Sequence, residues 1–144
     1  MLFKGEKESY VIASTLKGTL LHEGVPQLNT TITRRLRWNG NEDGLEETFT
    51  TDENGVFFLP PHRETLQIGA LNQFVAKMEI ETIVNGKVYE LWYSSKFEAD
   101  EYAETGGEIG NVICDINEEE TTVRAGLSKI STVCRWENMP ESIY

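Results

Sequence analysis

Several residues in this sequence have the types that could bind a metal ion. Asp52, Glu53 and Asn54 precede Gly55, and the segment 39–47 holds further Asn, Asp and Glu residues. An EF-hand calcium loop needs alternating ligands and a terminal glutamate across about twelve residues, and neither segment has that spacing. Asp, Asn and Gly are also the residues that tight turns favour. Both segments are therefore interpreted as turns, and no metal site is predicted.

The other candidate catalytic residues lack partners at a useful spacing. The only histidines are His22 and His62, and they show no ligand pattern with other His or Cys residues. No nucleophile motif surrounds Cys114, Cys134 or Ser94. We therefore expect no catalytic residues, no cofactor and no enzymatic activity.

The segment 98–110 contains the acidic residues that are most suggestive of binding. Loops at one end of a β-sandwich often bind ligands, and carboxylates around an aromatic side chain suit a basic protein. Further acids follow at Asp115 and at 118–120. The residues predicted to bind a partner are the acids of this segment and three aromatic anchors: Glu98, Asp100, Glu101, Glu104, Tyr102, Trp92 and Tyr93.

The composition points to one folded domain over residues 1–144 and restricts its partners. The net charge is −11, from 24 acidic and 13 basic residues, which disfavours nucleic acid and anionic membranes. No apolar stretch has the length of a signal peptide or a membrane span, so a cytoplasmic chain is expected. Cys114 and Cys134 lie in β-prone stretches; a bridge between them is conceivable, but the missing export signal favours reduced thiols.

The elements that must position these residues are all β-strands. Residues 28–38 alternate between apolar and polar types, with Arg34 as the exception on the apolar side, and 74–84 do the same. Glu79 and Glu81 share the polar face of the second run; a glycosidase pair could look like this, but a solvated face is commoner. The predicted strands are 10–21, 28–38, 47–51, 55–59, 74–84, 87–93, 111–116 and 128–136.

Two local features give more detailed expectations. Asn85-Gly86 tolerates the positive φ angles of a two-residue turn, so 74–84 and 87–93 should form an antiparallel hairpin. The alternation places Arg35 and Arg37 on one face and Arg34 on the other, which rules out one continuous phosphate patch. These arginines are predicted to pair with acids across the strands, such as Glu46 or Glu47, with Arg34 at a sheet edge.

The first part of the chain carries a family resemblance. Gly18-Thr19-Leu20-Leu21, then Gly24-Val25-Pro26, a strand, and Thr51-Asp52-Glu53-Asn54-Gly55-Val56-Phe57 together resemble the carboxypeptidase-regulatory, transthyretin-like β-sandwich domains. The pattern covers about the first 60 residues and departs from the family at Leu28-Asn29, where a small pair is usual. The resemblance implies a single antiparallel sandwich of about seven or eight strands.

The resemblance also bears on activity. The strand at 88–93 and the one at 111–115 are similar to a small group of uncharacterised bacterial cytosolic domains with this sandwich, which implies no activity. Transthyretin-like hydrolases of purine breakdown end in Tyr-Arg-Gly-Ser, whereas this chain ends in Pro140-Glu141-Ser142-Ile143-Tyr144. Intradiol dioxygenases, which share the architecture, use two Tyr and two His on iron, and no such spacing is present here.

We therefore expect a non-enzymatic domain that binds another protein. The most concrete form of this hypothesis is an acidic bacterial immunity protein that neutralises a basic toxin by direct binding, because charge complementarity speeds association. The alternative is an accessory, adaptor or structural module of a secretion or cell-surface system. A disulfide between the two cysteines would favour the alternative.

Overall fold

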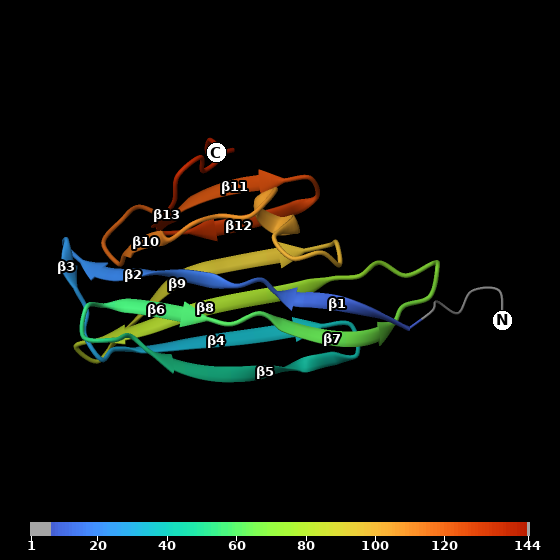
Figure 1. The fold of residues 1–144 in the computed structure, drawn as a ribbon, viewed down its shortest axis with the longest axis horizontal. Coiled ribbons are helices and arrows are strands. Elements are labelled where there is room, and N and C mark those ends of the chain that lie inside the picture. Colours follow the sequence, from blue (N-terminus) through green and yellow to red (C-terminus); the bar gives the residue numbers. More distant parts are fainter. Residues whose placement is uncertain (1–6, 144) are drawn as a thin grey trace.

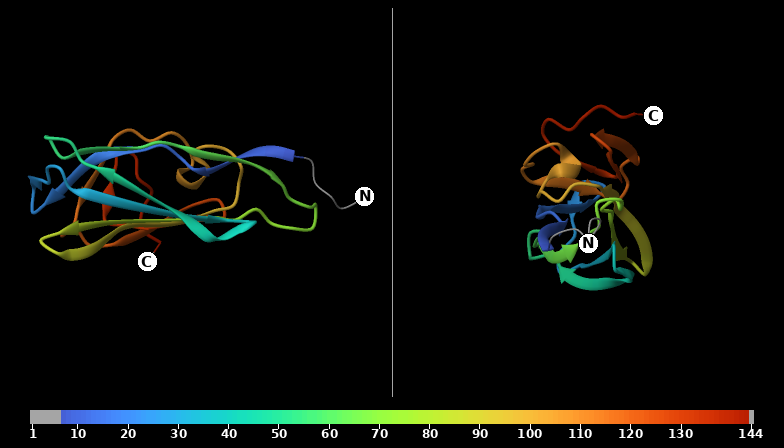
Figure 2. Two further views of the ribbon diagram at one scale, coloured as in Figure 1. Left: turned by 90° about the horizontal axis from the view of Figure 1, so that it is seen from below. Right: turned by 90° about the vertical axis from the view of Figure 1, so that its right-hand side faces the viewer.

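The computed structural model describes residues 7–143, which form two layers of β-strands (Figure 1, Figure 2). The front layer of Figure 1 contains seven strands: β1 (Lys7–Ala13), β2 (Leu16–His22), β3 (Val25–Pro26), β6 (Val56–Leu59), β7 (His62–Gln67), β10 (Val112–Asp115) and β13 (Cys134–Arg135). The back layer contains six: β4 (Thr31–Trp38), β5 (Asn41–Thr50), β8 (Ala76–Val84), β9 (Lys87–Lys96), β11 (Thr121–Ala125) and β12 (Ser128–Thr132). A 3-10 turn, η1 (Ala103–Thr105), follows β9.

The all-β prediction is confirmed, but the expected strand count is wrong. The described residues contain thirteen strands in three sheets rather than seven or eight in a single sandwich. Two of the extra strands come from breaks in predicted runs, because residues 14–15 separate β1 from β2 and Val133 separates β12 from β13. The strands β3, β7 and β11 were not predicted. These strands are short or rich in polar residues, so they show little of the alternation between apolar and polar residues that predicts a strand.

The back layer is one six-stranded sheet with the order β11-β12-β9-β8-β4-β5. The predicted alternation is confirmed in it, since Phe74, Ala76, Met78, Ile80, Thr82 and Val84 are all buried. The two-residue turn at Asn85-Gly86 is confirmed as well, with φ angles of 53° and 76°, and β8 pairs antiparallel with β9. Because successive strand residues point to opposite faces, the odd-numbered residues of β8 form the outer face of this sheet.

The front layer is built on a long antiparallel ribbon. β1 pairs with β7 and β2 pairs with β6, each antiparallel, and the two pairs lie end to end (Figure 1). β10 lies against the other edge of β2 in parallel, with Val112 opposite Gly18. A Cβ atom at Gly18 would lie 2.3 Å from the carbonyl oxygen of Val112. Only glycine therefore allows this close approach of β10.

A disulfide links the last two strands of the front layer. Cys114 on β10 and Cys134 on β13 are opposite each other, with their Cα atoms 4.0 Å apart, and their sulfur atoms are bonded. Both residues are buried. The reduced thiols that the sequence favoured are therefore replaced by a bridge, because strand pairing brings together two cysteines that lie 20 residues apart in sequence.

Arg34 lies inside the fold and not at a sheet edge. Its strand β4 pairs with β5 on one side and β8 on the other, and its side chain is only 1% exposed. The guanidinium group donates to Glu47 Oε1 at 2.8 Å and to the carbonyl oxygen of Pro60 at 2.6 Å, and it lies over the ring of Phe49. The predicted pairing with Glu47 is confirmed for Arg34, and these contacts compensate the buried charge.

The acidic turn before β6 has a structural role. Asp52 Oδ1 accepts hydrogen bonds from the backbone N–H groups of Asn54 and Val56, Gly55 has φ +79°, and Phe57 is buried. The turn that the sequence predicts is therefore present, and these side-chain hydrogen bonds make it an Asx-type turn. Among residues 7–143, no group of three or more His, Cys, Asp or Glu residues is arranged to hold a metal ion.

Replacing Gly18 with alanine should destabilise the domain by about 3 kcal/mol, because the new methyl group would overlap the backbone of β10. The free energy of unfolding from urea titrations would test this. Gly110→Ala is the matched control, since a Cβ atom there meets open space and its effect should stay below about 0.5 kcal/mol. Equal effects of the two substitutions would contradict the assigned packing of β2 against β10.

Candidate protein-binding surface

The outer face of the β8–β9 hairpin carries an ordered ladder of side-chain pairs. From the turn inward, Ile83 lies opposite Val88, Glu81 opposite Glu90, and Glu79 opposite Tyr93. A bulge between Ile80 and Glu81 shifts the register, so that Leu91 and Trp92 both point into the core. The exposed ladder therefore combines apolar, acidic and aromatic side chains along one hairpin.

Glu81 and Glu90, together with Glu120 just before β11, form what we call the acidic cluster. Like charges directly opposite each other on neighbouring strands are destabilising. Within residues 7–143, none of these three carboxylates takes part in a salt bridge. Partial burial raises the pKa of Glu90, and the charges of Glu120, Glu79 and Glu81 raise it further. The acidic cluster is therefore a surplus of negative charge that the domain itself does not compensate.

Side chains around the acidic cluster could provide apolar contact area. Tyr93, predicted as an anchor, is half-buried on this face between Glu79 and Ser131. Ile83 and Val88 are 49% and 55% exposed at the hairpin tip. Glu79 differs from the acidic cluster because Arg37 binds it at 2.7 Å. Aromatic and apolar side chains next to uncompensated charge are typical of protein interfaces.

The acidic loop 98–110 is arranged differently from the prediction. Glu101 Oε1 accepts hydrogen bonds from the backbone N–H and the hydroxyl group of Thr15, and Glu101 Oε2 lies 3.2 Å from Arg63. Burial acts to raise the pKa of Glu101, but the hydrogen bonds from Thr15 and the charge of Arg63 outweigh it and lower the pKa. Glu101 therefore fixes its loop to the front layer.

Two further predicted binding residues are buried. Trp92 is 1% exposed and packs against Trp136, with 5.5 Å between the ring centroids, so its predicted role as a surface anchor is wrong. Glu104, on η1, is 4% exposed, and burial raises its pKa. The inward position of Glu104 follows from the fold of the loop onto β12 and β9, which the charge pattern does not reveal.

A buried lysine explains why acids gather in this loop. Lys96, the last residue of β9, is 2% exposed, and its ammonium group donates to the carbonyl oxygen of Glu98. Burial lowers its pKa, while the charges of Glu104, Asp100, Glu98 and Glu101 act in the opposite direction. The loop acids thus compensate an internal cation.

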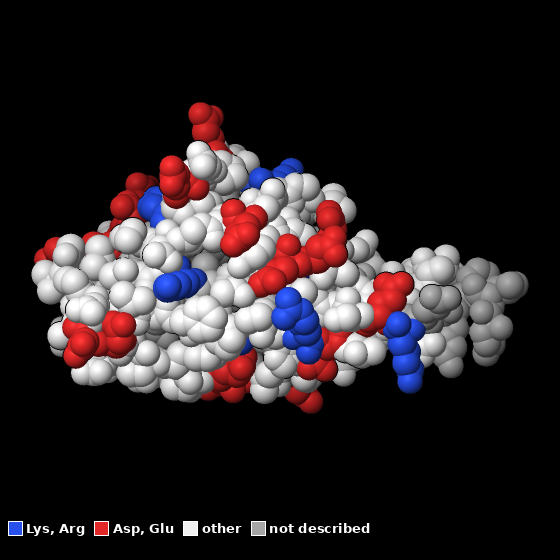
Figure 3. All heavy atoms as spheres, in the orientation of Figure 1, with Lys and Arg blue, Asp and Glu red and all other residues white. Residues whose placement is uncertain are grey.

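The remaining predicted residues of the loop lie at its surface or close to it. Glu98 and Asp100 are exposed, and Figure 3 shows acidic side chains gathered over the loop after β9. Tyr102 is half-buried with φ +66°, and its backbone N–H donates to Ser14 Oγ. Of the seven predicted binding residues, only Tyr93 lies on the same face as the acidic cluster.

The comparisons with known proteins identify a family. Residues 16–119 match a family described as Domain of unknown function (DUF6795). The chain belongs to this family. Neither the comparison with curated proteins nor that with solved structures found a match. The matched region of the DUF6795 domain contains Glu81, Glu90 and Tyr93 and ends one residue before Glu120. Within residues 7–143 of the domain, no helix has the length and apolar character of a membrane span.

The acidic cluster could have been found in the sequence. The alternation in 74–84 predicts a solvated polar face for Glu79 and Glu81, and it carries no information about Glu90. A two-residue turn at Asn85-Gly86 requires residue 84 to pair with 87, and counting outward from it places Glu81 opposite Glu90. The position of Glu120 in the acidic cluster, by contrast, depends on the strand order, in which β12 lies between β9 and β11.

Replacing Glu90 with glutamine should stabilise the DUF6795 domain by about 0.5 kcal/mol at pH 7, because it removes a like-charge pair. The raised pKa of Glu90 means that its protonation stabilises the fold. That contribution is complete below the unfolded pKa and is lost as the pH rises through the folded pKa. Urea titrations at several pH values would measure both effects.

The matched control is Glu53→Gln, an exposed acid in the turn before β6 that lies outside the acidic cluster. It should leave the free energy of unfolding nearly unchanged. If Glu90→Gln lowered the stability at neutral pH, the repulsion assigned to the acidic cluster would be wrong.

Proposed function

We propose that this DUF6795 domain acts without catalysis, by binding a basic protein on the acidic half of the outer sheet face. The observation that carries the proposal is the direct opposition of Glu81 and Glu90, with no salt bridge to either among residues 7–143. A free domain loses stability through this arrangement, whereas a bound lysine or arginine would reverse the loss.

The neighbouring side chains support contact with a protein rather than with a small cation. Tyr93 adjoins the acidic cluster, and Ile83 and Val88 are exposed beyond it. Aromatic anchors within a partly apolar patch supply most of the binding energy in protein interfaces. A partner that presents both cations and apolar side chains would match this ladder.

The most concrete form of this function is an immunity protein that neutralises a basic bacterial toxin in the cytoplasm. Such a protein works by covering the active site of the toxin. The net charge of −11 would steer a basic toxin toward the domain, and the acidic cluster would contribute specificity. Charge steering also predicts that association slows as the salt concentration rises.

We further propose that the fold is related to the transthyretin-like sandwiches. Support comes from the turn at 52–56 and from the burial of Phe57, which match the residues that carry the resemblance. The two-layered arrangement in Figure 2 is compatible with this relationship.

A second candidate function is favoured by one specific observation. The disulfide between Cys114 and Cys134 is typical of proteins in oxidising compartments. A structural or adaptor module of a secretion or cell-surface system would meet such conditions. Protein binding through the acidic cluster is compatible with this function too, so cellular location and the identity of the partner distinguish the two candidates.

Neutralising the acidic cluster should abolish capture of the partner. We expect the wild-type domain to retain a basic protein from a lysate of its native organism at low salt, and the variant Glu81→Gln/Glu90→Gln/Glu120→Gln to lose it. The purified partner should then bind the variant at least about tenfold more weakly in calorimetric titrations, because several charge contacts disappear together.

The variant Glu23→Gln/Glu53→Gln/Glu137→Gln is the matched control, since it removes the same charge from exposed positions outside the acidic cluster. It should retain the partner. Equal losses in both variants would show that net charge and not the acidic cluster determines binding. Toxicity of the partner in cells, relieved by co-expression of the wild-type domain, would separate the immunity function from the accessory function.

The redox state in native cells tests the second candidate. Acid quenching of native cells, followed by alkylation of the denatured protein, should leave Cys114 and Cys134 unmodified if the bridge forms in vivo. Reduction should then lower the free energy of unfolding by about 3 kcal/mol, the chain-entropy value for a loop of this length. Complete alkylation of both thiols after the acid quench would count against an oxidising compartment.

A further inference from the structure

The outer face of the six-stranded sheet also carries a row of basic residues, at the end opposite to the acidic cluster. The strand register places Arg124 beside Lys129, Lys129 beside Ser95, Ser95 beside Lys77, and Lys77 beside Arg37. We call Arg37, Lys77, Lys129 and Arg124 the basic row. It contains two direct like-charge pairs, and within residues 7–143 only Arg37 forms a salt bridge. This end of the face therefore has uncompensated positive charge.

The acidic cluster and the basic row are related by position. Between them runs a middle row that includes Thr122, Ser131, Tyr93 and Glu79 in register. On β8, Glu81 lies two residues to one side of Glu79 and Lys77 two residues to the other. At β11, Glu120 and Arg124 flank Thr122 in the same way. Except in the middle row itself, where Glu79 and Arg35 face their own counterparts, the face is thus self-complementary under a rotation that reverses the strand direction.

We propose that the domain forms a two-fold symmetric homodimer through this face, with the axis along the middle row. The rotation places Glu81 of one copy over Lys77 of the second copy, and Glu120 over Arg124, and symmetry repeats each contact. Glu90 lies over Ser95 of the second copy, between its Lys77 and Lys129. The dimer thereby pairs charges that have no salt bridge in the isolated domain.

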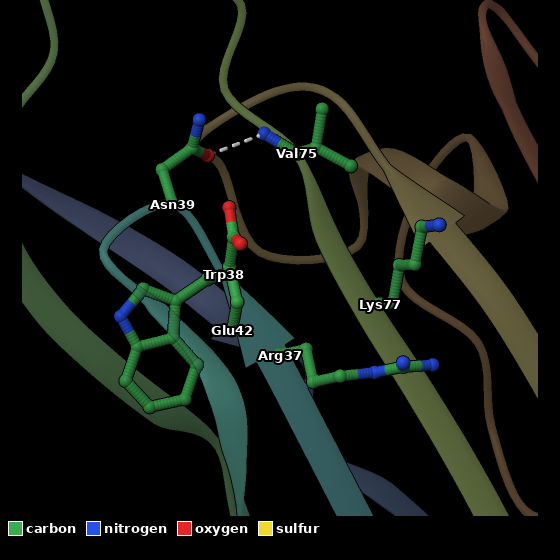
Figure 4. A pocket seen from close by; sticks show the side chains of 6 residues that line it. All are labelled: Arg37, Trp38, Asn39, Glu42, Val75 and Lys77. Atoms are coloured by element: carbon green, nitrogen blue, oxygen red, sulfur yellow. Dashed lines mark hydrogen bonds between the residues drawn. The ribbon is translucent and has the colours of Figure 1, made fainter.

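A hollow at the basic end agrees with the same rotation. It has a volume of about 360 Å³ and is lined by Arg37, Trp38, Val75 and Lys77, among others. Figure 4 shows Arg37 and Lys77 reaching out from the neighbouring strands β4 and β8. Val75 lies four residues before Glu79, and Ile83 lies four residues after it. The axis along the middle row therefore seats the exposed Ile83 over Val75 of the second copy, in this hollow.

The ionic strength decides whether the local pairing outweighs the repulsion between two chains of net charge −11. At about 0.15 M salt the screening length is about 8 Å, so charges far from the interface interact weakly while the facing pairs remain in contact. Dimerisation is thus expected at physiological ionic strength. It excludes a partner that covers Glu81 and Glu90, so such a partner would bind by displacing the second copy.

Charge exchange between Lys77 and Glu81 tests the dimer. Sedimentation equilibrium of the purified domain over a wide concentration range should give a monomer–dimer equilibrium. Lys77→Glu and Glu81→Lys should each weaken dimerisation at least about tenfold, because like charges then face each other twice. The double variant Lys77→Glu/Glu81→Lys restores opposite charges across the axis and should recover most of the affinity.

Several outcomes would overturn the proposal. One is a wild-type domain that stays monomeric at every concentration. Another is a net-charge effect alone, in which Glu81→Lys strengthens association and Lys77→Glu weakens it. A third is a double variant that fails to recover. Lys17→Glu and Glu53→Lys make the same charge changes at exposed positions of the front layer and its turn, and they should have little effect.

The charge-exchange variants should fold, so a loss of dimerisation can be assigned to the interface. Glu81→Lys removes the repulsion with Glu90, and Lys77→Glu removes the repulsion with Arg37, so each monomer should be at least as stable as the wild type. Thermal unfolding would confirm this. Because the dimer is measured without any other protein, its absence would leave the proposed binding of a basic partner untouched.

Discussion

The register of β8 against β9 is the constraint on which the outer face of the domain depends. The two-residue turn at Asn85-Gly86 sets this register, and the bulge between Ile80 and Glu81 shifts it by one residue. Because side chains alternate along a strand, the register that buries Thr82 and Val84 also brings Glu81 opposite Glu90. A slip by one residue would turn the core side chains outward. The core therefore holds the two carboxylates together despite their repulsion.

The buried cations Arg34 and Lys96 are compensated, whereas the acidic cluster on the outer sheet face is not. Arg34 is bound by Glu47 and by a backbone carbonyl, and Lys96 donates to the carbonyl oxygen of Glu98 beneath the acidic loop. Burial of an unpaired charge would be very costly, so the fold must provide these partners. At the surface the cost is small, and uncompensated charge persists there. This contrast is the reason why we propose the acidic cluster and the basic row as interaction surfaces.

The sequence located the residues of the proposed binding surface only in part. Tyr93 is on the outer face as its strand position requires, but Trp92 turns inward because the bulge places it and Leu91 on the same side. The acids around Tyr102 looked like a binding loop by proximity in sequence. In the fold, Glu101 binds Thr15 and Glu104 is buried, both through contacts with distant parts of the chain. Charge composition carries no information about such contacts.

The sequence by itself determined the all-β class, the alternation in β4 and β8, the hairpin turn at Asn85-Gly86 and the Asx-type turn at Asp52. Each depends on residues within a few positions of one another. Only the tertiary structure decided the parallel approach of β10 to Gly18, the pairing of Cys114 with Cys134, and the row that aligns Arg37, Lys77, Lys129 and Arg124. These features join strands far apart in sequence, and the order of strands in a sheet follows from packing of the whole core.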